Sequence, residues 1–264
     1  MQLINAIWSY RAFIAGSVKR EFQSQYNGSL LGALWLVLNP LAMVLIYTLV
    51  FSQVMKARLP GMDDTLSYSI YLIAGITTWT FFSEVVLRST TTFIEQANLL
   101  KKAVFPRISL PIIILISSSI NFVIIFSIFM GFLVVIDRVP GLVLLAFIPL
   151  LLLQQLIAIG LGLLLGTLNV FFRDIGQFTT IMLQFWFWLT PIVYPASVIP
   201  DWARDILFTW NPIAPIVQGY QTIVLQQQWP DWTSYYPQLI LGIGLFILSY
   251  TLFRKLSADM VDEL

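Results

Sequence analysis

Two opposite charges, Glu84 and Arg88, stand four residues apart at the end of a long apolar stretch. That spacing places both side chains on one face of a helix. An ionisable residue inside a membrane-spanning helix commonly marks a functional site. The structural alternative is that the two residues pair with each other while Arg88 extends toward the membrane surface. The residue types alone leave both interpretations open.

A second pair of charges, Arg173 and Asp174, is adjacent in the sequence and precedes the uncharged segment 175–200. Neighbouring residues do not face each other on a helix, so we expect each to have its own partner. Carbonyl groups at a helix C-terminus suit Arg173, and amide groups at a helix N-terminus suit Asp174. The pair therefore predicts a tight turn between two helices, and it places two charges at a potential pore entrance.

Aromatic residues gather in the last third of the chain, where six of the nine tryptophans fall between positions 186 and 232. Trp229, Trp232, Tyr235 and Tyr236 fit the aromatic belt found at membrane surfaces. Trp188 lies deeper in an uncharged segment and shares a helical face with Phe185. Flat aromatic faces suit the apolar C–H faces of sugar rings, so a carbohydrate path is the functional alternative here.

Several residue types are missing, and their absence excludes whole classes of site. The chain has no histidine and no cysteine, which excludes disulfides, the usual zinc sites and histidine-based acid–base catalysis. None of the five lysines follows a glycine, so no P-loop phosphate site can form. We therefore expect no enzyme activity, metal or cofactor in this chain, and any ATP and Mg²⁺ must be bound by another subunit. A net charge of +1 selects no nucleic acid.

The elements that position these side chains must be membrane helices. The chain is 58% hydrophobic and 10% charged, whereas soluble domains have about 25% charged residues. A span needs about 20 apolar residues, and seven uncharged segments reach that length. One of them, 206–230, contains Pro212 and Pro215 among many amides, which a lipid-facing helix could not satisfy. We therefore expect short re-entrant or interfacial helices over 195–230.

The resulting prediction is a single all-α integral membrane domain over residues 1–264 with six transmembrane helices. The expected spans are 30–55, 65–90, 108–136, 141–170, 177–195 and 234–254. Ten Lys and Arg residues then fall on one side and four on the other, which places both termini in the cytoplasm. Gly162 and Gly166 predict close approach of the fourth span to another helix.

Two further segments are expected at the cytoplasmic face. Residues 1–22 alternate apolar and basic positions as an amphipathic interface helix does. Residues 93–105 predict a short helix that ends at Phe105, because Pro106 disfavours helical geometry there. This second helix is either a lever for a partner protein or an ordinary basic loop.

Four segments, taken in their order and spacing, carry a resemblance to a known family. They are VKREFQSQYNGSLLGALWLVLNP (18–40), FRD (172–174), TPIVYP (190–195) and WNPIAPIVQGYQ (210–221). Together they resemble the membrane subunits (permeases) of ABC exporters for bacterial surface polysaccharides, namely O-antigen, capsule and teichoic acid. The resemblance extends over about residues 10–255.

The resemblance implies partners, a substrate and a location. It implies a homodimer in the bacterial inner membrane that binds two copies of an ATPase subunit and moves a polyprenyl-diphosphate-linked glycan outward. Segment 93–105 would be the coupling helix, and 195–230 would form periplasmic gate helices. A small-molecule or drug exporter is the nearer alternative, and a membrane sugar transferase is the more distant one.

On this interpretation the candidate residues fall into four groups. The coupling group is Glu95, Asn98, Lys101, Lys102, Phe105 and Arg107. The group for the lipid diphosphate at the cytoplasmic entrance is Arg11, Lys19, Arg20, Arg173 and Asp174. The candidates for the polymer path are Trp35, Phe185, Trp188, Tyr194, Trp210 and Tyr220. The fourth group is the intramembrane pair Glu84 and Arg88.

Overall fold

The structure is a computed structural model that describes residues 10–26, 32–50, 59, 65–102 and 107–263. Every regular element in these ranges is a helix. The α-helices are α2 (Arg11–Tyr26), α3 (Trp35–Thr48), α4 (Thr65–Glu95), α5 (Ala97–Lys102), α6 (Ser109–Val135), α7 (Phe147–Phe171), α8 (Asp174–Leu189), α9 (Asp201–Trp210), α10 (Ile213–Gln226), α11 (Tyr236–Leu256) and α12 (Asp259–Glu263). The short 3-10 helices are η1 (Gly32–Leu34), η3 (Gly141–Ala146), η4 (Ala196–Val198) and η5 (Trp232–Tyr235).

Four helical segments in the described part of the chain are long and apolar enough to cross a membrane. They are Leu66–Glu95, Ser109–Val135, Gly141–Phe171 and Trp232–Leu256. The other two expected spans correspond to α3 and α8, which have 14 and 16 residues. At about 1.5 Å per residue, each is shorter than the hydrocarbon core of about 30 Å. The all-helical class is therefore observed, and the count of six spans stays a prediction.

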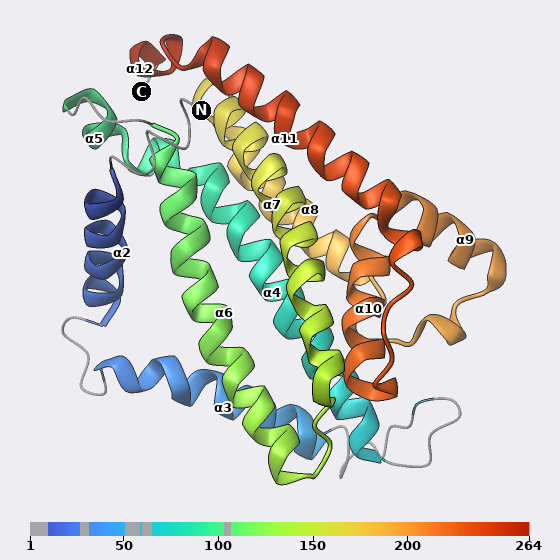
Figure 1. Ribbon diagram of the computed structural model, residues 1–264. Helices are drawn as coiled ribbons and strands as arrows, with labels where there is room; N and C mark the ends of the chain where they lie inside the picture. The colour runs from blue at the N-terminus through green and yellow to red at the C-terminus, as the bar shows by residue number, and fades with distance from the viewer. Residues whose placement is uncertain (1–9, 27–31, 51–58, 60–64, 103–106, 264) are drawn as a thin grey trace.

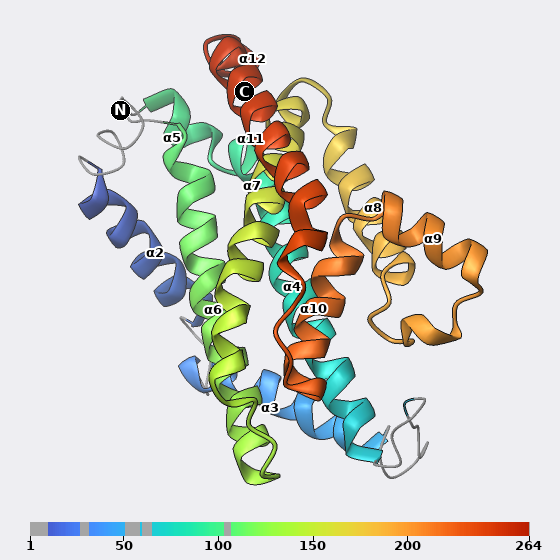
Figure 2. The ribbon, with the colours of Figure 1, turned by 45° about the vertical axis from the view of Figure 1, so that its right-hand side comes forward.

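The long helices form one bundle with α4 at its centre. Helix α4 contacts α3, α6, α7, α8 and α10, and α11 packs along α7. Figures 1 and 2 show α4, α6, α7 and α11 running along the bundle, with α3 crossing it at the end away from α5 and α12. The hydrophobic core lies between these helices and includes Phe82, Phe129, Leu150 and Ile157, none of them more than 1% exposed.

Glycines allow α4 and α7 to approach closely, as the spacing of Gly162 and Gly166 predicts. A Cβ atom at Gly162 would lie 2.6 Å from Cβ of Ser89 in α4, and one at Gly166 would overlap the Ser89 carbonyl. Gly160 has the same role on another face of α7, where its Cβ would lie 3.0 Å from the backbone nitrogen of Phe246 in α11. Helix α7 is therefore held tightly on two sides.

The region 195–230 consists of short helices, and they do not share one environment. Helix α9 has no buried residue, whereas α10 packs against α4 and α7 and buries nine side chains or backbone positions. Helix α10 is thus part of the protein core. A gating role for this region stays a prediction.

The segment predicted as one helix over 93–105 is divided. Phe93 and Glu95 belong to the last turn of α4, a turn occurs at Gln96, and α5 follows. Phe105 lies outside the described residues, as do residues 1–9 of the predicted N-terminal helix. Within 11–22, Ile14 and Val18 of α2 are buried and its basic residues are exposed. A position in the membrane interface stays a prediction.

Candidate functional site

A groove between α4 and α8 combines aromatic and polar side chains. Its volume is about 600 Å³. The residues that line it are Trp79, Thr80, Ser83, Glu84 and Leu87 of α4, and Thr180, Leu183, Gln184, Phe187 and Trp188 of α8. Hydroxyl, amide and carboxylate groups are unusual on the outside of so apolar a protein, so this groove is the candidate functional site.

Helix α8, which forms one side of the groove, has an outward and an inward face. Phe185 is 68% exposed and Trp188 is 60% exposed, and the exposed positions Gln177 and Gln184 lie on the same outward face. Trp186 points inward, where its ring contacts those of Trp79 and Phe82 at centroid distances of 6.1 and 5.4 Å. The inward aromatics fix the helix, and the outward ones remain available to a ligand or a partner.

The start of α8 is fixed by a buried amide in α7. Asn169 accepts a hydrogen bond from the backbone nitrogen of Gly176 at 2.8 Å and donates to the carbonyl oxygen of Thr90 at 2.9 Å. It thereby satisfies an amide in the first turn of α8, which lacks a side-chain cap of its own. The side chains of Arg173 and Asp174 are exposed at this turn and are not paired with any described residue. The predicted tight turn is present, but Asn169 stabilises it.

The end of α8 is an unwound segment whose carbonyl groups are satisfied by side chains of α4 and α10. The Pro191 carbonyl accepts hydrogen bonds from the hydroxyl of Tyr71 at 2.8 Å and from the amide of Gln221 at 3.2 Å. Tyr68 donates to the Val193 carbonyl. Such partners allow irregular backbone within a membrane protein, so side chains of α4 and α10 stabilise the break after Leu189.

Asn211 connects this break to the helices that follow it. Its amide nitrogen donates to the carbonyl of Leu189 at 3.1 Å and to the hydroxyl of Thr190 at 3.0 Å. Its oxygen accepts from the indole nitrogen of Trp186 at 2.8 Å and from the backbone nitrogen of Ile213 at 3.0 Å. One side chain therefore joins α8, the unwound segment and the start of α10.

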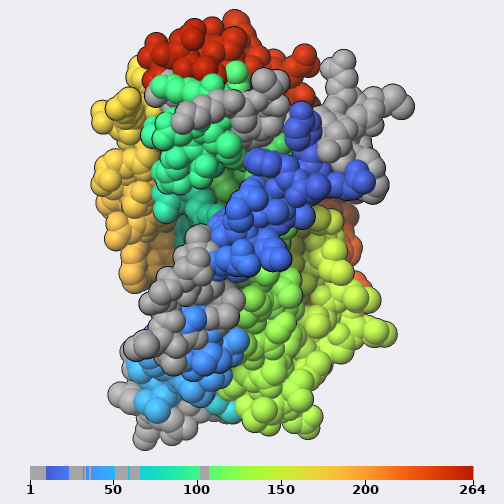
Figure 3. Space-filling view, turned by 90° about the vertical axis from the view of Figure 1, so that its left-hand side faces the viewer, coloured from blue at the N-terminus to red at the C-terminus, as the bar shows by residue number. Residues whose placement is uncertain are grey.

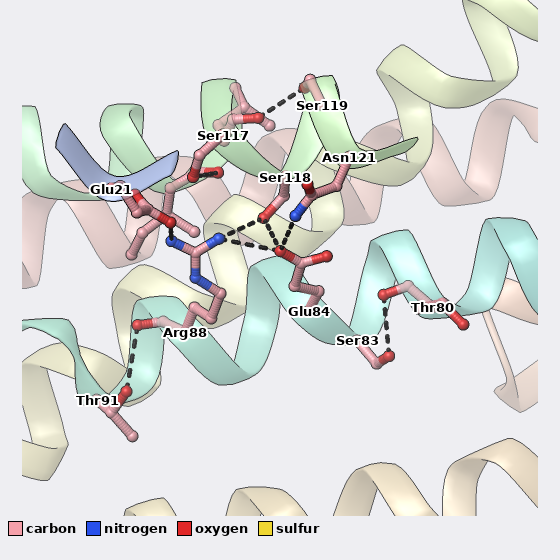
Figure 4. A network of polar contacts seen from close by, with 12 residues as sticks. Glu21, Thr80, Ser83, Glu84, Arg88, Thr91, Ser117, Ser118, Ser119 and Asn121 are labelled. Carbon is pink, nitrogen blue, oxygen red and sulfur yellow. Dashed lines mark hydrogen bonds and ion pairs between the residues drawn. The ribbon is translucent and has the colours of Figure 1, made fainter. Parts of the chain in front are cut away.

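An ionic network lies beside the groove and joins α2, α4 and α6 (Figure 4). Arg88 donates to Glu84 at 3.0 Å and to the Ser118 hydroxyl at 3.2 Å, and it forms an ion pair with Glu21. Glu84 also accepts from Ser118 at 2.8 Å and from Asn121 at 3.3 Å. Glu84 and Arg88 thus pair with each other, and Glu21 is a further partner that sequence reasoning did not assign. Among the described residues, no cluster of acidic side chains could hold a metal ion.

The basic candidates for a lipid diphosphate do not form one site. Arg11, Lys19 and Arg20 lie on α2, which packs against α6, and Figure 3 shows α2 lying across that face of the molecule. Arg173 lies at the turn between α7 and α8, and Figures 1 and 2 both place α8 well away from α2. The structure therefore separates these charges into two groups.

The coupling candidates lie around α5 at one end of the bundle. Glu95, Asn98 and Lys101 are exposed, and Arg107 is half-buried. The side chain of Lys102 is outside the described part. These exposed side chains could contact a partner.

The remaining polymer-path candidates have very different accessibility. Trp210 is 82% exposed and Trp35 is 41% exposed. Tyr194 is half-buried, and its hydroxyl donates to the Trp188 carbonyl at 2.6 Å. Tyr220 has no exposed surface, and its hydroxyl donates to Gln154 at 2.8 Å. Tyr220 is therefore a core residue, and we leave it out of the proposed path.

Comparison with known proteins agrees with this architecture. Residues 14–225 match the family described as ABC-2 type transporter. The O-antigen export system permease protein RfbA of Klebsiella pneumoniae is 30% identical over 250 residues, which are 93% of this chain and 92% of that protein. The protein of the same name from Myxococcus xanthus is 29% identical over 88% of this chain and 87% of its own length. The polysialic acid transport protein KpsM of Escherichia coli is 24% identical over 75% of this chain and 76% of its own length. A family match over most of the chain, joined to relatives that align along nearly the same length, shows that the chain belongs to the ABC-2 type transporter family of membrane proteins.

Proposed function

We propose that this chain is the transmembrane subunit of an ATP-driven exporter that moves a polyprenyl-diphosphate-linked polysaccharide, of the O-antigen kind, out of the cytoplasm across the bacterial inner membrane. Two copies of the chain form the path, and two copies of a separate ATPase subunit bind at the cytoplasmic side. The relatives whose names include O-antigen export support the class of substrate. ATP and Mg²⁺ belong to the ATPase subunits.

The outward face of α8 is the observation that supports a polysaccharide path. Phe185 and Trp188 alternate there with Gln177, Thr180 and Gln184, all of them exposed. Polar side chains at membrane depth are costly against lipid and are tolerated where they line a water-filled cavity or meet protein. A sugar polymer offers both hydroxyl groups for the amides and apolar ring faces for the aromatics. A second copy facing this surface would enclose such a path.

The clustering of basic residues supports the proposed orientation. Helix α5 with Lys101, the turn with Arg173, and the last turn of α11 with Arg254 and Lys255 lie at the end of the bundle where α12 contacts α5 and α7. Positive residues favour the cytoplasmic side. This end would therefore face the cytoplasm and the ATPase subunits.

A hydrophobic cluster would transmit force from α5 to the spans. Leu100 of α5 is 5% exposed and packs in one cluster with Phe93, Val170, Phe253 and Met260, which belong to α4, α7, α11 and α12. The Phe93 and Phe253 rings are stacked at a centroid distance of 5.5 Å. Well-packed interiors transmit displacement, so a push on α5 would move several long helices together.

Surface polysaccharide in the bacterium that encodes the chain tests this function. Deletion of the gene is expected to remove the polysaccharide from the cell surface and to leave lipid-linked polymer inside. The wild-type chain restores export, whereas the double variant Phe185→Ala with Trp188→Ala restores it poorly at normal expression. The matched control Tyr236→Ala removes an exposed aromatic of α11 and should restore export fully. Unchanged surface polysaccharide in the deletion strain would refute the function.

The drug-exporter alternative makes a different prediction in the same strain. Loss of a pump for small molecules would leave surface polysaccharide intact and lower the resistance of the cell to its substrates. Measuring both properties in one deletion strain therefore separates the two functions.

A further inference from the structure

A second pocket, separate from the groove between α4 and α8, lies among α9, α10 and the segment that leads into α11. Its volume is about 680 Å³, within the range of about 300–1,000 Å³ that is typical of ligand sites. Helix α10 supplies Gln218 and Thr222, α9 supplies Thr209, and the segment before α11 supplies Gln228, Trp229 and Asp231. Neither the proposed path nor the proposed coupling surface uses these residues.

The polar side chains of this pocket have hydrogen-bonding capacity to spare. The side chains of Thr209, Gln218, Thr222 and Gln228 form no hydrogen bond with other described residues, although the whole surrounding region is described. Asp231 uses Oδ1 to accept from the backbone nitrogen and hydroxyl of Thr233 at 3.1 and 2.7 Å, which leaves Oδ2 unused. Two amides, two hydroxyls and a carboxylate oxygen are therefore available to a ligand.

An aromatic face completes the pocket. Trp229 is 55% exposed, and its indole offers a flat apolar surface with a polar N–H group. The floor is held in place by Tyr235, whose hydroxyl lies so near Gly219 that a Cβ atom there would overlap it, and which donates to the Pro215 carbonyl at 3.3 Å. A belt tryptophan would account for Trp229 alone, but it does not account for the amides and hydroxyls gathered around it.

The charges of the pocket select the class of ligand. No lysine or arginine lines it, and Asp231 is its one acidic residue. A phosphate or diphosphate group would lack a counter-ion here and would be repelled by the carboxylate. Amides, hydroxyls and one carboxylate beside an aromatic face suit an uncharged molecule with many hydroxyl groups and an apolar ring face, which is a neutral sugar.

The position of the pocket fits polymer that has already crossed the membrane. The pocket lies at the start of α11. The other end of α11 leads into α12, which contacts α5. Since α11 has 21 residues, the two ends are separated by about 30 Å. If α5 faces the cytoplasm, the pocket lies toward the outer side of the membrane.

We propose that the pocket between α9, α10 and η5 binds neutral sugar units of the emerging polysaccharide on the outer side of the membrane, a site that rests on the proposed export function. Binding there would hold the polymer in place between two ATP-driven steps, so that it does not slip back before the next step.

Direct binding tests the site. The chain is reconstituted in nanodiscs, since maltoside detergents carry sugar head groups that would compete. The probe is the lipid-free oligosaccharide released by mild acid from the surface polysaccharide of the encoding bacterium, and binding is measured by calorimetry. Trp229→Ala is expected to weaken binding about tenfold, which corresponds to about 1.4 kcal/mol, and Trp229→Phe should retain most of it. Trp202→Ala, an exposed α9 tryptophan outside the pocket, should bind as the wild type does.

A double variant and a competition measurement also test the site. The double variant Gln218→Ala with Thr222→Val removes hydrogen-bonding groups without touching Trp229 and should also weaken binding about tenfold. Inorganic diphosphate should not compete with the oligosaccharide. Equal binding by wild type and both sets of pocket variants, or competition by diphosphate, would overturn the site. Absent binding to the wild type would overturn it too, while polysaccharide export in the complemented strain would still support the proposed function.

Discussion

At the scale of single residues, Gly162 and Gly166 show how side-chain size controls helix packing. Replacing Gly166 by Ala places a methyl group against the Ser89 carbonyl of α4. Overpacking of this kind costs about 1–3 kcal/mol, so we expect a lower melting temperature for Gly166→Ala when tryptophan fluorescence follows thermal unfolding.

Two other glycines provide a matched control. A Cβ atom at Gly131 of α6 or Gly244 of α11 would meet nothing within 4 Å. Alanine has a higher helix propensity than glycine, so Gly131→Ala and Gly244→Ala should leave the melting temperature unchanged or raise it. Equal melting temperatures for the Gly166 variant and these controls would show that α4 and α7 are not in close contact.

Arg88 allows a second residue-scale prediction. Arg88→Ala leaves Glu84 half-buried without its cation, and losing a hydrogen bond to a charged group costs about 1.5–3 kcal/mol. We expect the single variant to unfold at a lower temperature than the wild type. Adding Glu84→Gln should recover part of the loss, because the uncompensated charge is then removed. Strictly additive losses in the double variant would show that the pair is not coupled.

The residues that sequence reasoning recovered are those whose partners are local. The four-residue spacing of Glu84 and Arg88 is enough to predict their ion pair. Asn169, Asn211 and Gln221 were missed because the partners that join them to other elements lie 7 to 79 positions away in the chain. Pro191 could have indicated that such polar partners exist. A proline interrupts the helix of a span, and the carbonyl groups left without a helical partner then require hydrogen-bond donors from elsewhere in the protein.

At the scale of elements, the sequence correctly predicts helices in the long apolar segments of the described part of the chain, because each must satisfy its own backbone in lipid. The predicted helix 93–105 has less accurate boundaries. No glycine or proline stands near Gln96, so the sequence does not indicate the turn that separates α4 from α5 there. The burial of α10 was also missed. Its prolines and amides suggested an interfacial position, but the amide of Gln221 reaches its acceptor, the Pro191 carbonyl in the unwound segment after α8, only once the chain is folded.

Helix α5 provides the element-scale prediction. If it docks the ATPase subunit, Lys101→Glu should abolish stimulation of ATP hydrolysis in the assembled complex, because it reverses an exposed charge at the contact. Leu100→Ala should reduce stimulation with docking preserved, since it loosens α5 from the hydrophobic cluster. The control Lys255→Glu reverses an exposed charge at the same end of the bundle, outside α5. Full stimulation in the Lys101 variant would place docking elsewhere.

At the scale of the whole molecule, the chain has the features of one subunit of a larger complex. Its outward α8 face carries amides that a lipid environment does not favour, and α5 presents exposed polar groups at one end. Its sequence contains no P-loop. These features together support the proposal that a second copy faces α8 and that an ATPase subunit binds at the α5 end.

The most direct test of this account is purification of the tagged chain from its own bacterium, with ATP hydrolysis measured in the purified sample. We expect the chain to bring down an ATPase subunit in equal amount, and the activity to reside in that complex. The chain purified after removal of the ATPase should hydrolyse no ATP. Hydrolysis by the isolated chain, or purification of active exporter without any ATPase subunit, would contradict the central claim that the motor is a separate protein.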